Sequence, residues 1–329
     1  MNKKPAYFFI QLMLAALLLN ACSFGKQTDK VTVQLSWFHS VEYAGFYTAI
    51  DQGFYDDENL EVTLVAGGPE VDALAEVENG NAQFGIGTGD SLISAKSQQR
   101  DFLAVATIFR NNPLVIMSLT DGNIQKPEDL AGRTIGVIAP DLSTGWDVQT
   151  LALLQTLNVD KSTLNFVPIN DYHGANELNA GTMDAMSGMF ATNEPVQAQL
   201  DGNQLNMIYY KDYGVDVYSN VIFTTGEFAS NDPDLLARFI RATLKGYQYS
   251  IENPTQAAET SLKFDPSLNL ALQTATMNAQ IPFIATGDAP IGSMDVDVWE
   301  TTQQILLDFG LIPAKVDIST IYTNEYVTP

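Results

Sequence analysis

The stretch GIGTGDSLISA, residues 85–95, contains the tetrad Gly-Asp-Ser-Leu, a pattern found around the nucleophilic serine of some esterases. A serine nucleophile needs a histidine that takes its proton, and in these esterases the histidine stands near the C-terminal end of the chain. No histidine follows His173, and the acid before it, Asp171, has the wrong spacing. We therefore expect Ser91 to have no hydrolytic role.

The same stretch has a simpler interpretation as a turn and a helix start. The run FGIG is typical of a strand, the glycines permit a tight turn, and Asp90 or Ser91 can cap the helix that follows. In an open α/β sheet such a turn faces the ligand crevice, where free backbone amides can hold a ligand's polar edge. Asp90 and Ser91 are therefore candidate binding residues, and no catalytic residue is predicted.

Aromatic side chains cluster at the end of the first strand-like run and the start of the first helical stretch. Aromatic residues at helical spacing are usually core, and Phe46 is expected there. Trp37 differs because it ends a strand, where a flat side chain can stack on a flat ring at little entropic cost. We expect Trp37 to be a ligand platform, with Phe38, His39 and Tyr43 beside it, and His39 could donate a hydrogen bond.

A second set of candidates follows strand-like runs in the middle of the chain. Ser143 and Thr144 lie in the loop VIAPDLSTGWD, residues 137–147, and Asn193 and Glu194 follow the run DAMSGMF. Each could cap a helix, and for Ser143 capping and ligand contact are equally open. The carboxylate of Glu194 could also accept hydrogen bonds from the amino or imino edge of a heterocycle.

Four tyrosines, at positions 209, 210, 213 and 218, crowd a short later segment. Two of the four are expected only to pack, without the sequence showing which, and Tyr218 is kept as a candidate ligand contact. Among the basic residues, Arg110 alone stands where it could meet an anion. This scarcity argues against nitrate or sulfonate as the ligand, although one arginine does not decide the matter.

The elements that must position these residues alternate between short β-rich runs and amphipathic stretches, which predicts an α/β fold with parallel sheet. Gly53 and Gly80 stand where two helices should end. From Asp232 onward the pattern is helical, so the last third is expected to form a helical coat. A length of 329 residues, 46% of them hydrophobic, favours two lobes.

The N-terminal residues have the pattern of an export signal. Two lysines precede the apolar run FFIQLMLAALLL, which is too short to span a bilayer as a mature helix. Leu-Asn-Ala-Cys follows, and Cys22 is the only cysteine of the chain. We expect residues 1–21 to be a signal peptide, Cys22 to carry lipid, and residues 22–30 to be a tether that holds the protein outside the cytoplasm on the bacterial cell membrane.

Charge excludes several classes of partner. The net charge is −23, and removal of residues 1–21 would leave 14 basic and 39 acidic residues, a net charge of −25. Nucleic acid and anionic membrane surfaces would repel such a chain. With one cysteine and only His39 and His173, disulfides are excluded and a zinc site is not expected. No cofactor is predicted.

Three stretches together carry a resemblance: VQLSWFHSVEYAGFYTAIDQGFYDDENLEVTLVAGG, GNAQFGIGTGDSLISA and KPEDLAGRTIGV. They resemble the solute-binding lipoproteins of ABC importers with the type II periplasmic-binding fold, in the branch similar to the thiamine-pyrimidine synthase. The segment AMSGMFATNEPVQ is similar to one in members associated with riboflavin-type ligands. The resemblance covers the chain from about Val31 to the C-terminal helices.

The resemblance implies two lobes joined by a hinge that the chain crosses twice. We place the crossings near Pro113 and Asn220. Lobe one would then comprise residues 31–113 and 221–329, and lobe two residues 114–220.

The expected function is capture of a small, flat, heteroaromatic nutrient, riboflavin-like or a thiamine pyrimidine precursor, for delivery to a membrane permease. The protein is expected to be a monomer and not an enzyme. One alternative is a pyrimidine synthase, whose resemblance implies pyridoxal phosphate and histidine as substrates and a cysteine-rich motif that this chain lacks. Others are a binder of nitrate- or sulfonate-type anions, and a sensor or surface protein without a transporter.

Overall fold

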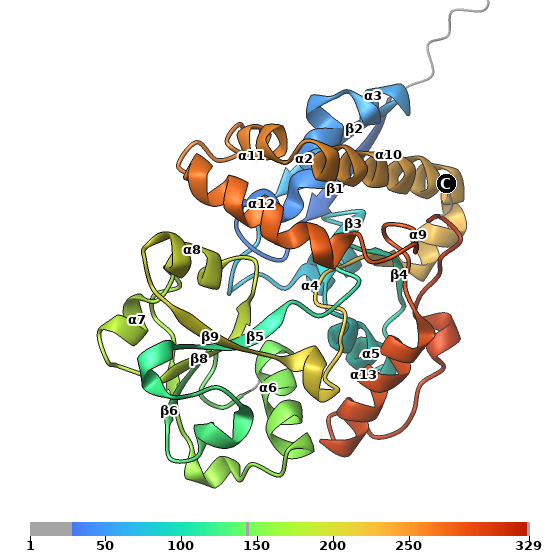
Figure 1. Cartoon of the computed structure of the whole chain (residues 1–329). Coiled ribbons are helices and arrows are strands. Elements are labelled where there is room, and N and C mark those ends of the chain that lie inside the picture. Colours follow the sequence, from blue (N-terminus) through green and yellow to red (C-terminus); the bar gives the residue numbers. More distant parts are fainter. Residues whose placement is uncertain (1–27, 143–144, 328–329) are drawn as a thin grey trace, which may run out of the picture.

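Two five-stranded sheets, each flanked by helices, form the computed structural model, which describes residues 28–142 and 145–327 (Figure 1). The first sheet has the strand order β2-β1-β3-β10-β4 and contains β1 (Asp29–Gln34), β2 (Leu60–Val65), β3 (Phe84–Gly87), β4 (Phe102–Thr107) and β10 (Val221–Thr225). The second has the order β7-β6-β8-β5-β9 and contains β5 (Leu114–Leu119), β6 (Thr134–Val137), β7 (Asn165–Pro168), β8 (Ala185–Phe190) and β9 (Leu205–Tyr209). We call the parts built on these sheets lobe one and lobe two.

Helices cover both lobes. Those of lobe one are α2 (Ala44–Asp51), α3 (Phe54–Asp57), α4 (Ala73–Glu78), α5 (Gly89–Ser97), α9 (Gly226–Asn231), α10 (Pro233–Glu252), α11 (Pro254–Ser261), α12 (Leu270–Ile284) and α13 (Val296–Asp308). Those of lobe two are α6 (Gly145–Thr156), α7 (Asn176–Asn179) and α8 (Glu194–Leu200). Short 3-10 turns are η1 (Val41–Tyr43), η2 (Thr120–Gly122), η3 (Pro127–Leu130), η4 (Lys161–Thr163), η5 (Tyr210–Tyr213) and η6 (Ile318–Thr320).

Both sheets are mixed, which corrects the expectation of a parallel sheet. Strands β1, β2 and β3 pair in parallel, but β10 runs antiparallel to β3 and β4. In lobe two, β5 runs antiparallel to β8 and β9. The antiparallel strands β5 and β10 are those that enter directly from the other lobe. They arrive without the helical crossover that would align them with their neighbours.

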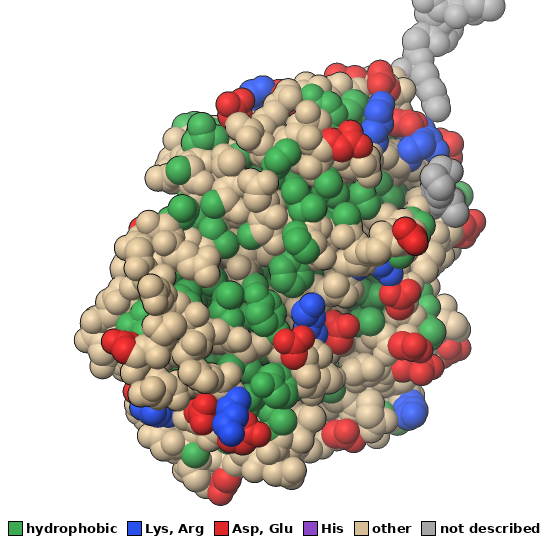
Figure 2. Space-filling view, viewed as in Figure 1, with side chains coloured by type: hydrophobic (Ala, Val, Ile, Leu, Met, Phe, Trp, Pro, Cys, Tyr) green, Lys and Arg blue, Asp and Glu red, His purple; other side chains and the backbone are tan. Residues whose placement is uncertain are grey.

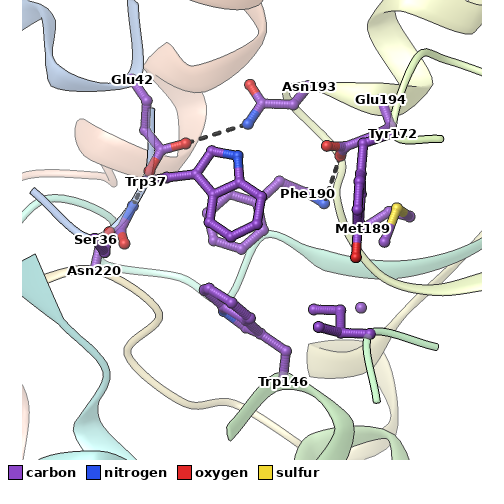
Figure 3. Close-up of a pocket in the computed structure, with 12 residues that line it drawn as sticks. Ser36, Trp37, Glu42, Trp146, Tyr172, Met189, Phe190, Asn193, Glu194 and Asn220 are labelled. Carbon is purple, nitrogen blue, oxygen red and sulfur yellow. Dashed lines mark hydrogen bonds between the residues drawn. The ribbon is translucent and has the colours of Figure 1, made fainter. Parts of the chain in front are cut away.

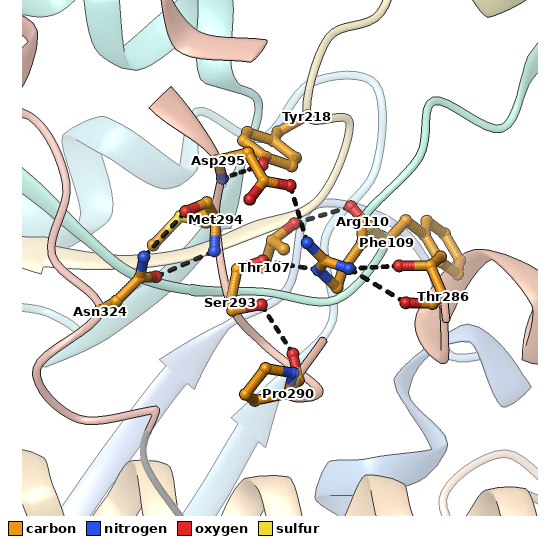
Figure 4. Close-up of polar contacts among 10 residues, drawn as sticks. All are labelled: Thr107, Phe109, Arg110, Tyr218, Thr286, Pro290, Ser293, Met294, Asp295 and Asn324. Carbon is orange, nitrogen blue, oxygen red and sulfur yellow. Dashed lines mark hydrogen bonds and ion pairs between the residues drawn. The ribbon is translucent and has the colours of Figure 1, made fainter. Parts of the chain in front are cut away.

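The first passage between the sheets, from Thr107 to Leu114, is fixed to the C-terminal segment through Arg110 (Figure 4). The Arg110 guanidinium pairs with Asp295 at 2.7 Å and also bonds Thr286 and the Ser293 carbonyl oxygen. This side chain is 7% exposed. The guanidinium of Arg110 is therefore bound within the protein. The sequence had suggested that it could meet an anion, and the structure does not present it to one.

Helix α12 reaches from lobe one to lobe two, in agreement with the expected helical C-terminal third. It packs against α8, and Phe283 near its end lies against buried residues of lobe two. Gln273 and Gln280 of α12 bond the backbone N–H and carbonyl of Val41 at 2.6 and 2.9 Å. Helix α12 therefore holds η1 in place beside the junction of the lobes.

Helix α2, which continues η1, is fixed from its other side by α10. The two helices cross at Gly45 and Gly246, where a Cβ atom on Gly246 would collide with the Gly45 carbonyl oxygen. Helix α2 ends before Gly53, which adopts a φ of 72°, a conformation that suits glycine. The predicted helix stop at Gly53 is confirmed.

The surface reflects the acidic composition. Figure 2 shows acidic side chains spread over one face, while hydrophobic side chains gather near its middle, where the lobes meet. Among the described residues, no helix combines the length and apolarity needed to span a bilayer.

Candidate functional site

A small cavity of about 50 Å³ lies between the two lobes (Figure 3). Lobe one and the second passage between the sheets contribute Ser36, Trp37, Glu42 and Asn220. Lobe two contributes Ile138, Trp146, Tyr172, Gly188, Met189, Phe190, Asn193 and Glu194. We call this space the inner cavity.

Trp37 is held by backbone hydrogen bonds that continue the pairing of β1 with β2 past the ends of both strands. Its carbonyl oxygen accepts from the Gly67 N–H at 2.8 Å, and its N–H donates to the Tyr43 hydroxyl at 3.1 Å. Gly67 has no room for a side chain, because a Cβ atom would lie against the backbone of Leu35 and Ser36. The close approach at Gly67 therefore sets where the indole of Trp37 points.

Three aromatic rings from both lobes meet edge to face in the cavity. The ring centroids of Trp37 and Trp146 are 5.9 Å apart at 88°, and those of Trp37 and Tyr172 are 6.0 Å apart at 73°. Such contacts are typical of aromatic pairs packed on one another. The rings are therefore packed on each other across the junction of the lobes.

Glu42 connects lobe one to the second passage and to lobe two. Its carboxylate accepts hydrogen bonds from Asn220 Nδ2 at 2.6 Å and from Asn193 Nδ2 at 3.2 Å. Glu42 is 5% exposed, and burial raises the pKa of its carboxyl, although both amides partly counteract this. Since Asn193 belongs to lobe two, its bond to Glu42 spans the cleft.

Glu194 adds a second carboxyl to the cavity from the start of α8. It accepts a hydrogen bond from the Phe190 N–H at 3.3 Å. Burial raises the pKa of its carboxyl to about 7, and the nearby Glu42 contributes in the same direction. Among the described residues that line the inner cavity there is no lysine, arginine or histidine. Its polar side-chain groups are two carboxyls, two amides, two hydroxyls and two indole N–H groups.

The structure brings some of the predicted residues together and not others. Trp37, Asn193 and Glu194 line the inner cavity. Phe38 and His39 border an adjoining space outside it, where Phe38 is 54% exposed. The His39 Nδ1 lies 2.9 Å from the Tyr47 hydroxyl.

Four other candidates, Tyr43, Tyr218, Asp90 and Ser91, lie away from the cavity. Tyr43 is fully buried, and its hydroxyl contacts Ser36 and the Trp37 N–H, so it supports Trp37 from behind. Tyr218 is also buried, and its hydroxyl accepts from the Asp295 N–H at 2.6 Å beside the Arg110 clamp (Figure 4). Asp90 is buried in the first turn of α5.

The N-cap of α5 is Thr88, which corrects the expectation of Asp90 or Ser91, and Ser91 instead completes a capping box from the third helical position. The Ser91 N–H and hydroxyl both bond Thr88, which forms a capping box at the start of α5.

Cys22, Ser143 and Thr144 lie outside the described residues. Within the part of the chain that the structure describes, no three His, Cys, Asp or Glu residues gather as metal ligands would.

Sequence reasoning missed Glu42, Trp146, Tyr172 and Asn220. Glu42 reads as an ordinary polar residue at a helix start, and only the fold shows that it is buried. Trp146 lies in the segment already singled out for Ser143, and an aromatic residue at the helix start after that loop was the available signal. Tyr172 had no local pattern that distinguishes it from a surface residue, and Asn220 was placed at a crossing between the lobes but not at the site.

Comparison with known proteins identifies the family. The profile described as NMT1/THI5 like matches residues 40–257, well over half of the chain. The chain belongs to the NMT1/THI5-like family. It is similar to the formylaminopyrimidine-binding protein of Halalkalibacterium halodurans, with 24% identity over 90% of this chain and 91% of that protein. Its identity to the riboflavin-binding protein RibY of Chloroflexus aurantiacus is 26%, over 91% and 86%.

Synthases and solved structures complete the comparison. The 4-amino-5-hydroxymethyl-2-methylpyrimidine phosphate synthase of Legionella pneumophila is 22% identical over 91% of this chain and 92% of its own. The periplasmic aliphatic sulphonate binding protein SsuA of Escherichia coli superposes with a TM-score of 0.70 at 13% identity, covering 89% and 91% of the two chains. The expected two-lobed periplasmic-binding fold is therefore confirmed.

Proposed function

We propose that this NMT1/THI5-like protein is the extracytoplasmic solute-binding component of an ABC importer and binds a flat heteroaromatic nutrient between its lobes. The ligand is riboflavin-like or a thiamine pyrimidine precursor, and the protein hands it to a membrane permease without altering it. The observation that carries the proposal is the inner cavity, walled by Trp37, Trp146 and Tyr172. The names of two relatives, a formylaminopyrimidine-binding and a riboflavin-binding protein, agree with it.

Ligand entry requires the lobes to separate before they close over the ring. Sites for small molecules usually have volumes of about 300 to 1,000 Å³, and the inner cavity has about 50 Å³. A ring held between two aromatic faces needs them about 7 Å apart, twice the van der Waals contact distance. The perpendicular packing of Trp37 on Trp146 must therefore open, and we propose hinges near Pro113 and Asn220.

The polar groups of the cavity suit the edge of a heterocycle. Carboxylates of Glu42 and Glu194 accept hydrogen bonds from ring N–H or exocyclic amino groups, and the Asn193 amide can donate or accept. Stacking would supply affinity, and these few polar groups would fix the ring's orientation.

An anion fits this cavity poorly. Among the described residues, no basic side chain lines it, and two carboxyls do. Arg110, the sequence candidate for an anion contact, pairs with Asp295. A nitrate or sulfonate would therefore lack a counter-charge, although the fold is shared with SsuA.

The enzyme alternative rests on the synthase relatives. It is less favoured because the chain has a single cysteine, Cys22, whereas the synthase resemblance implies a cysteine-rich motif. An absorption spectrum of the purified protein would show bound pyridoxal phosphate if this alternative held.

Native mass spectrometry tests the proposed function directly. Protein purified without denaturation should release one small heteroaromatic compound, present in an amount comparable to the protein. Release of a nitrate- or sulfonate-type anion instead would overturn the proposal.

The lipid anchor gives a prediction about location. If Cys22 carries lipid, the wild-type protein should fractionate with membranes, and Cys22→Ser should move it to the soluble fraction, because several acyl chains anchor stably without a membrane-spanning helix. Cell fractionation with a salt wash measures this. Persistent membrane association of Cys22→Ser would contradict the anchor.

The raised pKa of Glu194 predicts a pH dependence. Between its ordinary value of 4.5 and about 7, the folded ligand-free protein keeps a proton that the unfolded chain has lost. Stability should therefore fall as pH rises through this window. Glu194→Gln should remove this pH dependence. The melting temperature of the variant, relative to that of the wild type, should therefore increase as pH rises. Melting curves with the same pH profile for both would contradict it, and Glu128→Gln on the surface of lobe two is the control.

A further inference from the structure

A second space lies outside the inner cavity, on the other side of Trp37 and Tyr172. It consists of two adjoining hollows of about 240 and 340 Å³. Trp37, Tyr172 and Glu194 border both hollows and the inner cavity as well. We call the two hollows the outer groove. It is several times larger than the inner cavity, and these three side chains, with Asn193 beside the 240 Å³ hollow, lie between the two spaces.

Polar side chains of lobe one face the outer groove with hydrogen-bonding capacity to spare. Gln273 is 5% exposed and uses its Oε1 to accept from the Val41 N–H, which leaves its Nε2 as a donor. Thr276, one turn further along α12, is 2% exposed and makes no side-chain hydrogen bond within the described chain. His39 uses only Nδ1, for Tyr47, and keeps Nε2.

The side chains of Gln273 and Thr276 carry no charge, and of these three only His39 can be protonated. Burial lowers the pKa of His39, and the opposing influence of Asp265 is smaller, so the ring is neutral at pH 7. The acidic groups that border the groove are Asp171 and Glu194, and the ring nitrogen Nδ1 of the exposed His173 lies 2.8 Å from the Asp171 carboxyl. Among the described residues that line it, there is no lysine or arginine.

A ligand that enters the inner cavity and extends past Trp37 would meet this row of groups. We infer that the outer groove binds an uncharged, hydroxyl-bearing chain attached to the ring, with Thr276, Gln273 and His39 as its hydrogen-bond partners. Hydroxyl groups both donate and accept, so they match an amide N–H, a threonine hydroxyl and an imidazole nitrogen. Neither the Thr276 hydroxyl nor the Gln273 Nε2 bonds another described residue or is sealed from solvent, so both are open to a ligand that reaches the groove.

The inference rests on the proposed function and specifies it further. Of the two ligand classes proposed, it selects the larger one, a heterocycle with a polyhydroxylated chain, over a bare aminopyrimidine. A small pyrimidine would fill the inner cavity after opening and leave the outer groove without a ligand.

The test compares riboflavin with lumiflavin, which has the same ring system with a methyl group in place of the ribityl chain. Calorimetry on the wild type should give at least about tenfold tighter binding of riboflavin. Thr276→Val keeps the side-chain shape and removes the hydroxyl, so it should weaken riboflavin binding about fivefold and leave lumiflavin unchanged. Thr274→Val, two residues earlier on the same helix and outside the groove, should change neither.

Other results would show whether the inference fails alone or together with the proposed function. Equal affinities for riboflavin and lumiflavin, or an equal loss for both in Thr276→Val, would overturn the inference and leave the proposed function standing. Binding of 4-amino-5-hydroxymethyl-2-methylpyrimidine but of neither flavin would do the same. If none of the three compounds bound, the proposed function would fail together with the inference.

Discussion

Replacing Trp37 with alanine should weaken ligand binding at least tenfold and leave the fold intact. The indole is half-buried at the junction of the lobes and touches Trp146 and Tyr172 of lobe two. Stacking contributes about 0.5 to 1.5 kcal/mol beyond area burial, and truncating a central aromatic anchor costs about 2 kcal/mol or more. Titration calorimetry with riboflavin measures the affinity, and the melting temperature without ligand measures the fold.

Trp299 provides the matched control, because it is a tryptophan of the core. It is fully buried, and its ring centroid lies 5.5 Å from that of Tyr322, on which it stacks. It does not line the inner cavity. Trp299→Ala should cost about 3 to 5 kcal/mol of stability through the cavity it leaves. The folded fraction of that variant should bind normally. If Trp37→Ala behaved in the same way, Trp37 would be a core residue.

Removing the carboxyl of Glu42 should weaken binding by about tenfold or more, through the closed arrangement of the lobes. A hydrogen bond to a charged group contributes about 1.5 to 3 kcal/mol, and the bond from Asn193 spans the cleft. Glu42→Ala would leave the Asn193 and Asn220 amides without this acceptor. Small-angle scattering with bound ligand should show a larger radius of gyration than for the wild type.

Two further variants separate the closing role from a general effect of charge. Glu42→Gln keeps one acceptor oxygen but turns an N–H toward one of the two amides, so its affinity should fall between those of Glu42→Ala and the wild type. Glu227→Ala, an exposed acid on α9, should bind normally. Wild-type affinity and an unchanged scattering curve for Glu42→Ala would show that Glu42 does not hold the lobes together.

The sequence predicted the class of fold well, because the signals are local. Alternating β-rich and amphipathic runs indicated α/β structure, and the glycine after α2 stands where the helix ends. The direction of β5 and β10 could not be predicted in this way. It depends on how the chain passes between the lobes, and a strand has the same residue pattern in either direction.

The site was predicted only in part, and the difference lies in how far apart its residues are in the sequence. Trp37 and Glu194 each follow a strand, a position that by itself suggests a cleft. Glu42 is recognisable only through Asn193 and Asn220, which lie 151 and 178 residues away. Asp90 and Ser91 also follow a strand, but their turn is used to start α5. A strand end is therefore a useful signal here, but it is neither necessary nor sufficient, since Glu42 lies in η1 and Trp146 in α6.

Titration calorimetry with three ligands tests the central claim most directly. The purified protein would be titrated with riboflavin, with 4-amino-5-hydroxymethyl-2-methylpyrimidine and with an alkanesulfonate. We predict that at least one of the two heteroaromatic compounds binds with one site per chain, that Trp37→Ala loses this binding, and that the alkanesulfonate gives no signal. Binding of the alkanesulfonate alone, unaffected by Trp37→Ala, would contradict the account.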